Sequence, residues 1–199
     1  MEAFNRLEAV ALPFAQANVD TDQIVPARYL QKPRADDFGQ YLFRDLRFAQ
    51  TGEARPQFLL NQPVFSQARI VVAGRNFGCG SSREHAVWAL YDYGFRAVIA
   101  PSFGDIFRTN ALKNGFLPIV LPEEAVSEMI ADLLARPGAR IAIELEAQTV
   151  KAPDASLHRF DIAPFAKHCL LRGLDEIDFT LSQAEKISAF ERDYNGAAP

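Results

Sequence analysis

A glycine-rich stretch at residues 74–83 carries the side chains best suited to chemistry. Three glycines in it allow tight backbone turns that leave several amide N–H groups facing one point. Ser81, Ser82 and Arg83 follow the last of these glycines and add two hydroxyls and a guanidinium. Hydrogen-bond donors and positive charge gathered in this way suit a carboxylate or phosphate ligand.

Apolar runs on both sides predict the elements that position this stretch. Residues 68–73 form an apolar run of strand length, and apolar residues recur at helical spacing from Ala86 to Tyr93. The turn therefore joins a strand to a helix start, where free N–H groups and the helix dipole favour an anion. Ser81 and Glu84 also have the spacing of a capping box, which gives Ser81 a purely structural interpretation. The glycine spacing fits neither the dinucleotide-binding nor the phosphate-loop pattern.

The rest of the chain predicts a single α/β domain over residues 1–199, with a mixed sheet flanked by helices. Further strands are expected at 8–14, 97–100, 116–121, 141–147 and 156–162, the last two pairing with each other. Further helices are expected at 102–114, 122–135, 164–171 and 182–194. Ser102 and Asp105 are the expected start signal of the first of these helices, and a capping box from Ser182 to Glu185 should start the last.

Two segments stand apart from this alternation. Residues 28–63 are rich in charge and aromatic side chains, and a connection of this length is usually a functional lid or an interface, so we expect it to face substrate or a partner. Its aromatic residues should pack on this domain or on a partner; they are Phe38, Tyr41, Phe43 and Phe48. Residues 174–199 are expected to form a C-terminal helix and a frayed tail. Asp20 and Asp22 lie in a polar loop where aspartate commonly bonds its own backbone.

Composition excludes several classes of protein. The net charge of −4 and the lack of a basic run argue against a nucleic-acid partner. The N-terminus lacks the pattern of a secretion signal and no apolar run reaches membrane-spanning length, so we expect a cytoplasmic protein without a membrane partner. Cys79 and Cys169 do not have metal-ligand spacing, so no metal is expected on this chain. Cys169 fits a buried small hydrophobe.

The sequence NFGCGSSREHA at residues 76–86 resembles the signature of the aconitase superfamily's swivelling domain. It is most similar to the small subunits of bacterial 3-isopropylmalate dehydratases, and residues 20–26 and 100–107 resemble further motifs of that family. The likeness covers nearly the whole chain; one departure is Val87, where bacterial small subunits often carry proline. The resemblance implies a swivelling β/β/α domain that closes over an active site held by a larger, iron–sulfur-bearing subunit.

The resemblance also implies a hydro-lyase reaction of leucine biosynthesis, in which 2-isopropylmalate becomes 3-isopropylmalate through 2-isopropylmaleate. This reaction needs a base for a carbon-bound proton, a Lewis acid for the departing hydroxyl, and clamps for two carboxylates. In the family the Lewis acid is a four-iron four-sulfur cluster held by three cysteines. Two separated cysteines cannot provide that site, so the cluster is expected on the large subunit and no cofactor on this chain.

Carried over residue by residue, the resemblance implies that Ser81 is the base. Turn N–H groups, the helix dipole and Arg83 would stabilise its alkoxide. Ser82 and Arg83 would hold a substrate carboxylate, and Asp22 would orient active-site groups. His85 could polarise the site or could be a helix residue bonded to backbone.

Arg28 and Lys32 follow in a loop that, in the family, helps to choose the substrate, and both are candidate substrate-binding residues. The apolar pair Tyr29 and Leu30 favours an isopropyl group over a third carboxylate. The small subunit of a homoaconitate, citraconate or dimethylmalate hydratase remains an alternative. A non-catalytic dicarboxylate-binding module, in which Ser81 only caps a helix, is a second alternative.

Overall fold

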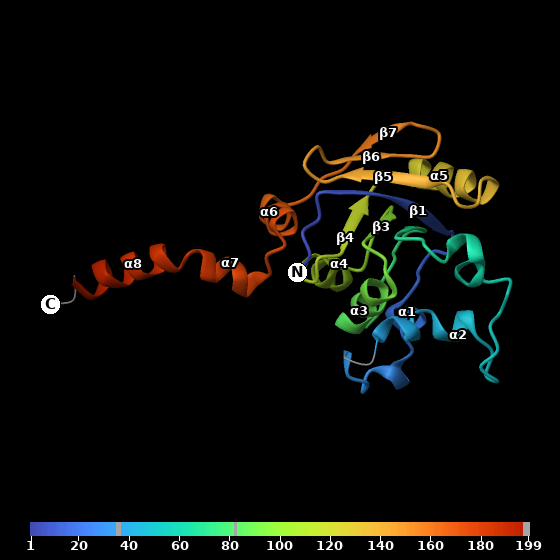
Figure 1. Ribbon diagram of the computed structural model, residues 1–199, viewed down its shortest axis with the longest axis horizontal. Helices are drawn as coiled ribbons and strands as arrows, with labels where there is room; N and C mark the ends of the chain where they lie inside the picture. Colours follow the sequence, from blue (N-terminus) through green and yellow to red (C-terminus); the bar gives the residue numbers. More distant parts are fainter. Residues whose placement is uncertain (35–36, 82, 197–199) are drawn as a thin grey trace.

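The computed structural model describes residues 1–34, 37–81 and 83–196, and its centre is one mixed sheet (Figure 1). In this part of the chain the strands follow the order β4-β3-β2-β1-β5-β6-β7. β1 to β4 run parallel, whereas β5, β6 and β7 continue from β1 as an antiparallel meander. The strands are β1 (Arg6–Phe14), β2 (Ile70–Ala73), β3 (Ala97–Ala100), β4 (Leu117–Val120), β5 (Arg140–Glu144), β6 (Thr149–Lys151) and β7 (Leu157–Arg159). The predicted mixed α/β sheet is therefore confirmed.

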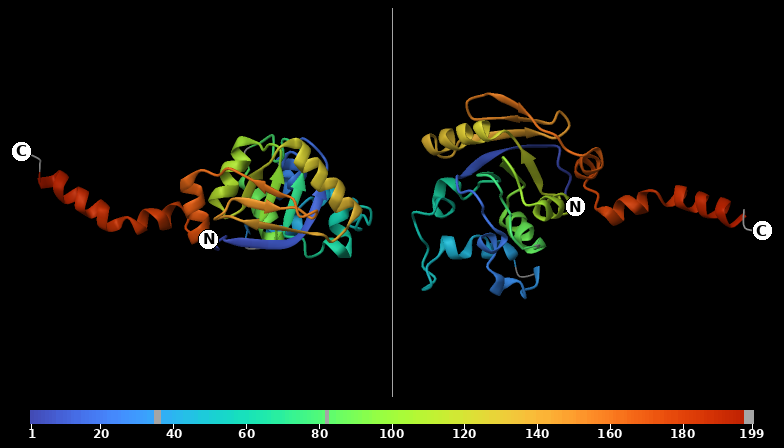
Figure 2. Two further views of the ribbon diagram at one scale, coloured as in Figure 1. Left: turned by 90° about the horizontal axis from the view of Figure 1, so that it is seen from above. Right: turned by 180° about the vertical axis from the view of Figure 1, so that it is seen from behind.

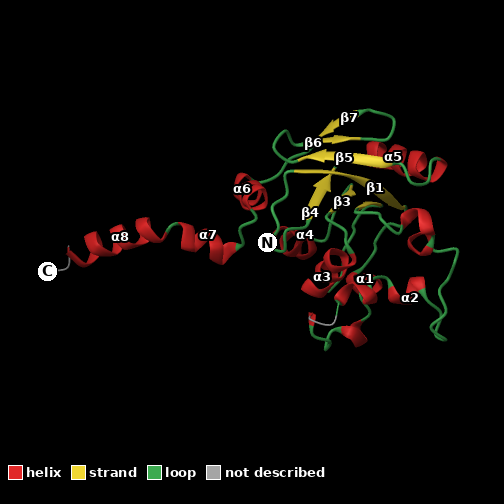
Figure 3. Ribbon diagram, viewed as in Figure 1, coloured by secondary structure: helices red, strands yellow, loops and turns green. Residues whose placement is uncertain are grey.

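Helices cover both faces of this sheet (Figure 3). The longer ones in its body are α3 (Glu84–Tyr93), α4 (Asp105–Lys113), α5 (Glu123–Ala135) and α6 (Pro164–Arg172). α3 and α4 form the crossovers that join parallel strands, as such strands require. Both faces of β2 and β3 are buried, which explains why their sequences are continuously apolar rather than alternating.

Alternate residues of each central strand enter two separate hydrophobic cores. Val71 and Val98 pack in the core that contains α3. Ile70 and Ile99 pack in the opposite core, together with Met129 of α5. The period of two in the strands thus fixes which helix lies on which face.

The long connection between β1 and β2 packs on the α3 side of the sheet. It contains short helical segments: α1 (Thr21–Ile24), η1 (Ala27–Tyr29), η3 (Phe38–Tyr41), α2 (Arg44–Arg47), η4 (Leu59–Asn61) and η5 (Pro63–Phe65). Phe38 and Phe43 are fully buried, and Tyr41 packs against the same core. Phe48 is half-buried beneath the guanidinium of Arg44, 4.0 Å from its ring centre. The prediction that these four aromatic residues pack on the domain or on a partner is confirmed.

Several predicted boundaries are wrong. The strand at 156–162 does not pair with the strand at 141–147, because β6, which the sequence reading missed, lies between β5 and β7. β5 ends at Glu144 because the chain turns at 145–148, with Gln148 at φ 54°. α4 begins at Asp105 with Gly104 as its N-cap residue, so Ser102 does not start it.

The C-terminal segment holds two helices, α7 (Glu176–Ser182) and α8 (Ala184–Gly196), where one was predicted. The capping box lies at Asp175 and Asp178, at the start of α7, and the predicted box from Ser182 to Glu185 is wrong. Ser182 instead donates its hydroxyl to the carbonyl of Phe179. Figures 1 and 2 show both helices projecting from the body of the molecule as an arm. Residues 197–199 of the predicted frayed tail lie outside the described part.

Within the described residues, no helix combines the length and the apolar character that a membrane crossing requires.

Candidate functional site

The three loops that leave the carboxyl ends of β1, β2 and β3 meet beside one another. The N–H of Gly78 donates to the carbonyl of Val19 at 2.7 Å, and the N–H of Thr21 donates to the carbonyl of Cys79 at 3.0 Å. On the other side, the N–H of Phe77 donates to the carbonyl of Ser102 at 3.1 Å. The carboxyl edge of parallel strands is where open α/β sheets place their ligands. All three sequence motifs therefore lie at one place in the fold.

Two glycines give the central turn its shape. Gly78 and Gly80 have φ values of +72° and +85°, a backbone region that favours glycine. A Cβ on Gly78 would lie 2.3 Å from the ring of Phe107, whereas a Cβ on Gly80 would lie 3.4 Å from the nearest atom, on Asp20. Gly78 is thus required for space and conformation together.

The side chains of Asn18, Asn76 and Ser102 hold the start of this turn. The side-chain amide of Asn76 donates to Asn18 at 2.9 Å, and its backbone N–H donates to the hydroxyl of Ser102 at 2.9 Å. Asn76 itself adopts φ 59°, a conformation that asparagine tolerates better than most residues. The contact explains why Ser102 serves the turn and not the start of α4.

The predicted capping box between Ser81 and Glu84 is wrong. α3 begins at Glu84 with Arg83 as its N-cap residue, and no side chain of the described residues caps it. The carboxylate of Glu84 accepts a hydrogen bond from the side chain of Asn114 at 2.7 Å, and Asn114 also accepts the indole N–H of Trp88 at 3.1 Å. The first turn of α3 is therefore held by Asn114, which lies at the C-terminal end of α4.

Ser81 lies just before α3, exposed to solvent. Its backbone carbonyl accepts a hydrogen bond from the hydroxyl of Thr21 at 2.9 Å, and Thr21 is buried with 2 % exposure. A buried threonine thus fixes the backbone of the exposed serine. Ser81 itself lies ahead of the N-terminus of α3, which is the positive end of the helix dipole.

Asp22 and Arg83 form an ion pair across the site. A guanidinium nitrogen of Arg83 lies 2.8 Å from a carboxylate oxygen of Asp22, and the same oxygen accepts the N–H of Ala27 at 2.8 Å. The hydrogen bond from Arg83 lowers the pKa of Asp22 below the ordinary aspartate value. Asp20, by contrast, caps α1 by accepting the N–H of Gln23 at 2.7 Å. The loop aspartates therefore have different roles, and Asp22 is the one that reaches the site.

The remaining predicted substrate-binding residues are not all brought together. Arg28 forms a two-point ion pair with Asp45 of α2, which lowers the pKa of that carboxyl. Lys32 is exposed, and its backbone N–H donates to Tyr29 at 3.0 Å. Ser82 lies outside the described residues.

His85 lies in an aromatic cluster. Its ring centre is 4.6 Å from that of Trp88 and 5.4 Å from that of Phe38. Phe38 belongs to η3, so the cluster anchors the segment 28–63 on α3. This packing was not foreseen for His85.

Comparisons with known proteins decide the family. A family model described as the aconitase C-terminal domain matches residues 1–124, and one described as LeuD_N matches residues 127–164. A "3-isopropylmalate dehydratase small subunit" of Parvibaculum lavamentivorans is 46 % identical over 100 % of this chain and 99 % of its own length. That of Rhodospirillum centenum is 51 % identical over 96 % of this chain and 94 % of its own. The chain belongs to the 3-isopropylmalate dehydratase small-subunit family.

A solved structure agrees with membership of this small-subunit family. A crystal structure of 3-isopropylmalate dehydratase from Methanocaldococcus jannaschii superimposes with a TM-score of 0.66 at 25 % identity. The match covers 94 % of this chain and 99 % of that one. The fold predicted from the three motifs is therefore confirmed for this member of the family.

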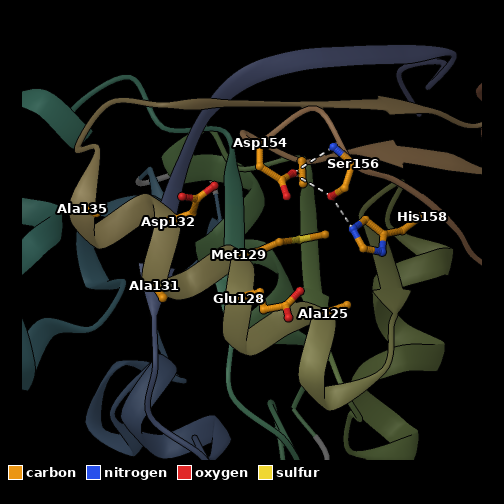
Figure 4. Close-up of a pocket in the computed structure, with 10 residues that line it drawn as sticks. Ala125, Glu128, Met129, Ala131, Asp132, Ala135, Asp154, Ser156 and His158 are labelled. Atoms are coloured by element: carbon orange, nitrogen blue, oxygen red, sulfur yellow. Dashed lines mark hydrogen bonds between the residues drawn. The ribbon is translucent and has the colours of Figure 1, made fainter.

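One further group in this small-subunit chain has the residue types of a catalytic triad but not its geometry. A cavity of about 590 Å³ lies between α5 and the turn from β6 to β7, and Figure 4 shows the side chains that line it. In it, the hydroxyl of Ser156 lies 2.6 Å from a carboxylate oxygen of Asp154 and 2.9 Å from Nε2 of His158. The hydroxyl proton goes to the carboxylate, so the imidazole cannot act as its base, as a catalytic triad would require. We interpret this group as a set of hydrogen bonds that stabilises the turn from β6 to β7.

Proposed function

We propose that this chain is the small subunit of a 3-isopropylmalate dehydratase, a hydro-lyase that acts together with a separate large subunit. It isomerises 2-isopropylmalate to 3-isopropylmalate through 2-isopropylmaleate, in the cytoplasm. Family membership supports this function. The observation in the structure that carries it is the group formed by Ser81, Arg83 and Asp22 at the start of α3.

Ser81 is the base that takes the carbon-bound proton. A serine hydroxyl is a weak acid, so its alkoxide needs a positive environment. The turn supplies backbone N–H groups, the end of the α3 dipole and the nearby guanidinium of Arg83. No side chain in the described part of the chain caps the start of α3. Ser81 is exposed to solvent and is therefore accessible for this role.

Arg83 binds a substrate carboxylate through paired N–H groups, which lysine lacks. Its side chain is only 20 % exposed and is aligned by Asp22, which is itself tied to the backbone of Ala27. Asp22 therefore acts as a positioning residue for the guanidinium. Arg28, Lys32 and Ser82 complete the substrate-binding set in this proposal, and segment 28–63 faces the substrate or the partner.

The iron–sulfur cluster of the family does not fit this chain. Cys79 is half-buried at the turn, whereas Cys169 is 7 % exposed in α6, and two thiols cannot replace three cysteine ligands. Burial, with the charge of Asp20, raises the pKa of Cys79, which disfavours the thiolate that a metal needs. In the proposed heterodimer the large subunit holds the cluster, and this chain supplies the base and the carboxylate clamp.

The test is reconstitution. The tagged chain is purified anaerobically with its large subunit, and hydration of 2-isopropylmaleate is measured beside a Ser81→Ala variant. We expect wild type and variant to recruit the same iron-bearing chain, because Ser81 is exposed. Turnover by the variant should fall roughly 100- to 10,000-fold, the usual contribution of a positioned acid or base.

Ser66→Ala is a matched control, because Ser66 is another exposed serine, whose hydroxyl donates to Pro63 at 2.8 Å. It should retain wild-type turnover. Turnover unchanged in Ser81→Ala would remove the base assignment, and an active complex lacking any second chain would remove the proposed partnership.

A further inference from the structure

A second basic pocket lies in the connection between β1 and β2. It has a volume of about 450 Å³ and is walled by Tyr29 of η1, by α2 and by the loop that follows α2. Its lining residues are Arg28, Tyr29, Arg44, Asp45, Phe48, Ala49, Gln50 and Arg55. This volume lies in the range that takes a small molecule.

The charges of the pocket are unbalanced. Three arginines face one acid, Asp45, and both oxygens of that carboxylate bind Arg28. Among the described residues, no acidic side chain is ion-paired with Arg44 or Arg55. The lining of the pocket therefore has an excess of two positive charges.

Arg44 also has an unsatisfied donor. Its Nη1 atom is buried and has no hydrogen-bond partner within the described part of the chain. The guanidinium is held over the ring of Phe48 at 4.0 Å, which fixes its position. A buried donor without a partner is unfavourable, and an anion that draws this guanidinium into a hydrogen bond would relieve the cost.

We propose that this pocket binds a carboxylate of a small dicarboxylate, with Arg44 and Arg55 as the binding residues. Guanidinium groups pair with a carboxylate through two N–H donors, whereas the walls of Phe48 and Ala49 accept a short apolar substituent. The charge and the volume alone call for a small anion; the choice of a dicarboxylate rests on the proposed function. Asp45 holds Arg28 through their two-point ion pair. The negative charge of Asp45 also acts on Asp22 and opposes the lowering of the Asp22 pKa.

The test uses malonate as the probe and the full chain without its large subunit. Malonate is titrated while backbone amide shifts are followed by NMR. We expect shifts at Phe48, Ala49 and Gln50, in addition to any at the glycine turn. Arg44→Gln and Arg55→Gln should each weaken binding at these amides at least tenfold. Arg55 is exposed, so its variant keeps the fold if Arg44→Gln does not.

Arg172→Gln is the matched control, because Arg172 is an exposed arginine in the last turn of α6. It should bind malonate as wild type does. Shifts confined to residues 78–83, or wild-type affinity in the Arg55→Gln variant, would overturn the proposal.

Turnover of the reconstituted complex distinguishes an error in the pocket proposal from an error in the proposed function. If the reconstituted complex is active but malonate does not bind in this pocket, the pocket proposal is overturned and the proposed function stands. An inactive complex whose pocket binds malonate overturns the proposed reaction and leaves an anion site.

Discussion

The chemistry proposed for the candidate site depends on one residue pair that the fold brings together from far apart in sequence. Asp22 and Arg83 are separated by 61 positions, yet a guanidinium nitrogen lies 2.8 Å from a carboxylate oxygen. The carboxylate is 59 % exposed, so solvent screens the pair and its contribution to stability is small. In the proposed function, the pair aims the guanidinium so that a substrate carboxylate meets it in a fixed orientation.

The pair predicts a measurable titration. Arg83 lowers the pKa of Asp22 in the folded state, so the pair stabilises the fold above the ordinary aspartate pKa, and this contribution is lost as the pH falls through the lowered value. In an NMR titration, the Asp22 carboxyl should titrate below the ordinary aspartate range in wild type. In Arg83→Gln its midpoint should rise.

Asp154 is an internal control for this titration. Its pKa is lowered by the hydroxyl of Ser156, at a cavity lined by α5 and not by α3. Its midpoint should be the same in wild type and in Arg83→Gln. Equal Asp22 midpoints in the two proteins would show that Arg83 does not hold the carboxylate in solution.

At the scale of elements, the glycine turn is held by close packing as well as by hydrogen bonds. Gly78→Ala should destabilise the fold by about 2–5 kcal/mol, the sum of a left-handed backbone cost and overpacking against Phe107. Gly52→Ala isolates the first term, because Gly52 has φ +89° and open space around its Cβ position. Chemical denaturation should show that Gly52→Ala lowers the free energy of unfolding by only about 1–2 kcal/mol. Equal losses in both variants would mean that the Phe107 ring yields without cost.

The elements also show what the sequence could and could not predict. β2, β3 and α5 were predicted closely because their apolar periodicity is strong and they are buried on the faces that the period assigns. β6 was missed because it has three residues, with Val150 alone buried. A run this short carries no periodicity, so only its pairing with β5 and β7 defines it.

Of the predicted site residues, the structure brings Asp22 and Arg83 together. The contacts that support the candidate site were not predicted. Spacing could identify Ser81 and Arg83, because both lie in one continuous motif. It also suggested that Ser81 caps α3, but Glu84 is drawn instead to Asn114, which lies 30 positions away. Thr21 likewise supports Ser81 across 60 positions. Such contacts depend on how three loops meet at the sheet edge, which local patterns do not encode.

At the scale of the whole molecule, the two cores and the arm are distinct. No described residue of α7 or α8 belongs to either hydrophobic core. The arm exposes a series of large apolar side chains, which are Ile177, Leu181, Ile187, Phe190 and Tyr194. It leaves the body after α6, next to the N-terminus, whereas the site lies beyond the carboxyl end of β1. The arm therefore stands away from the candidate site.

A truncation after Gly173 tests this separation. The arm meets the body through Phe179, whose ring centre is 4.9 Å from that of Phe165, and through an exposed ion pair of Lys113 with Glu176. An aromatic pair contributes about 1 kcal/mol, and an exposed ion pair adds little. The chain 1–173 should therefore unfold cooperatively, with a free energy of unfolding within about 2 kcal/mol of the full chain.

A truncation after Ala163 removes more of the chain, including α6, and should behave differently. Leu170 of α6 is fully buried in the α5-side core, and its carbonyl accepts the N–H of Phe4 at 2.8 Å. Loss of one buried leucine side chain alone costs about 2–5 kcal/mol, so this chain should be strongly destabilised. Equal stability of the two truncations in urea denaturation would place α6 outside the folded body. If the chain 1–173 failed to fold, the arm would be shown to stabilise the two cores although it contributes no residue to them.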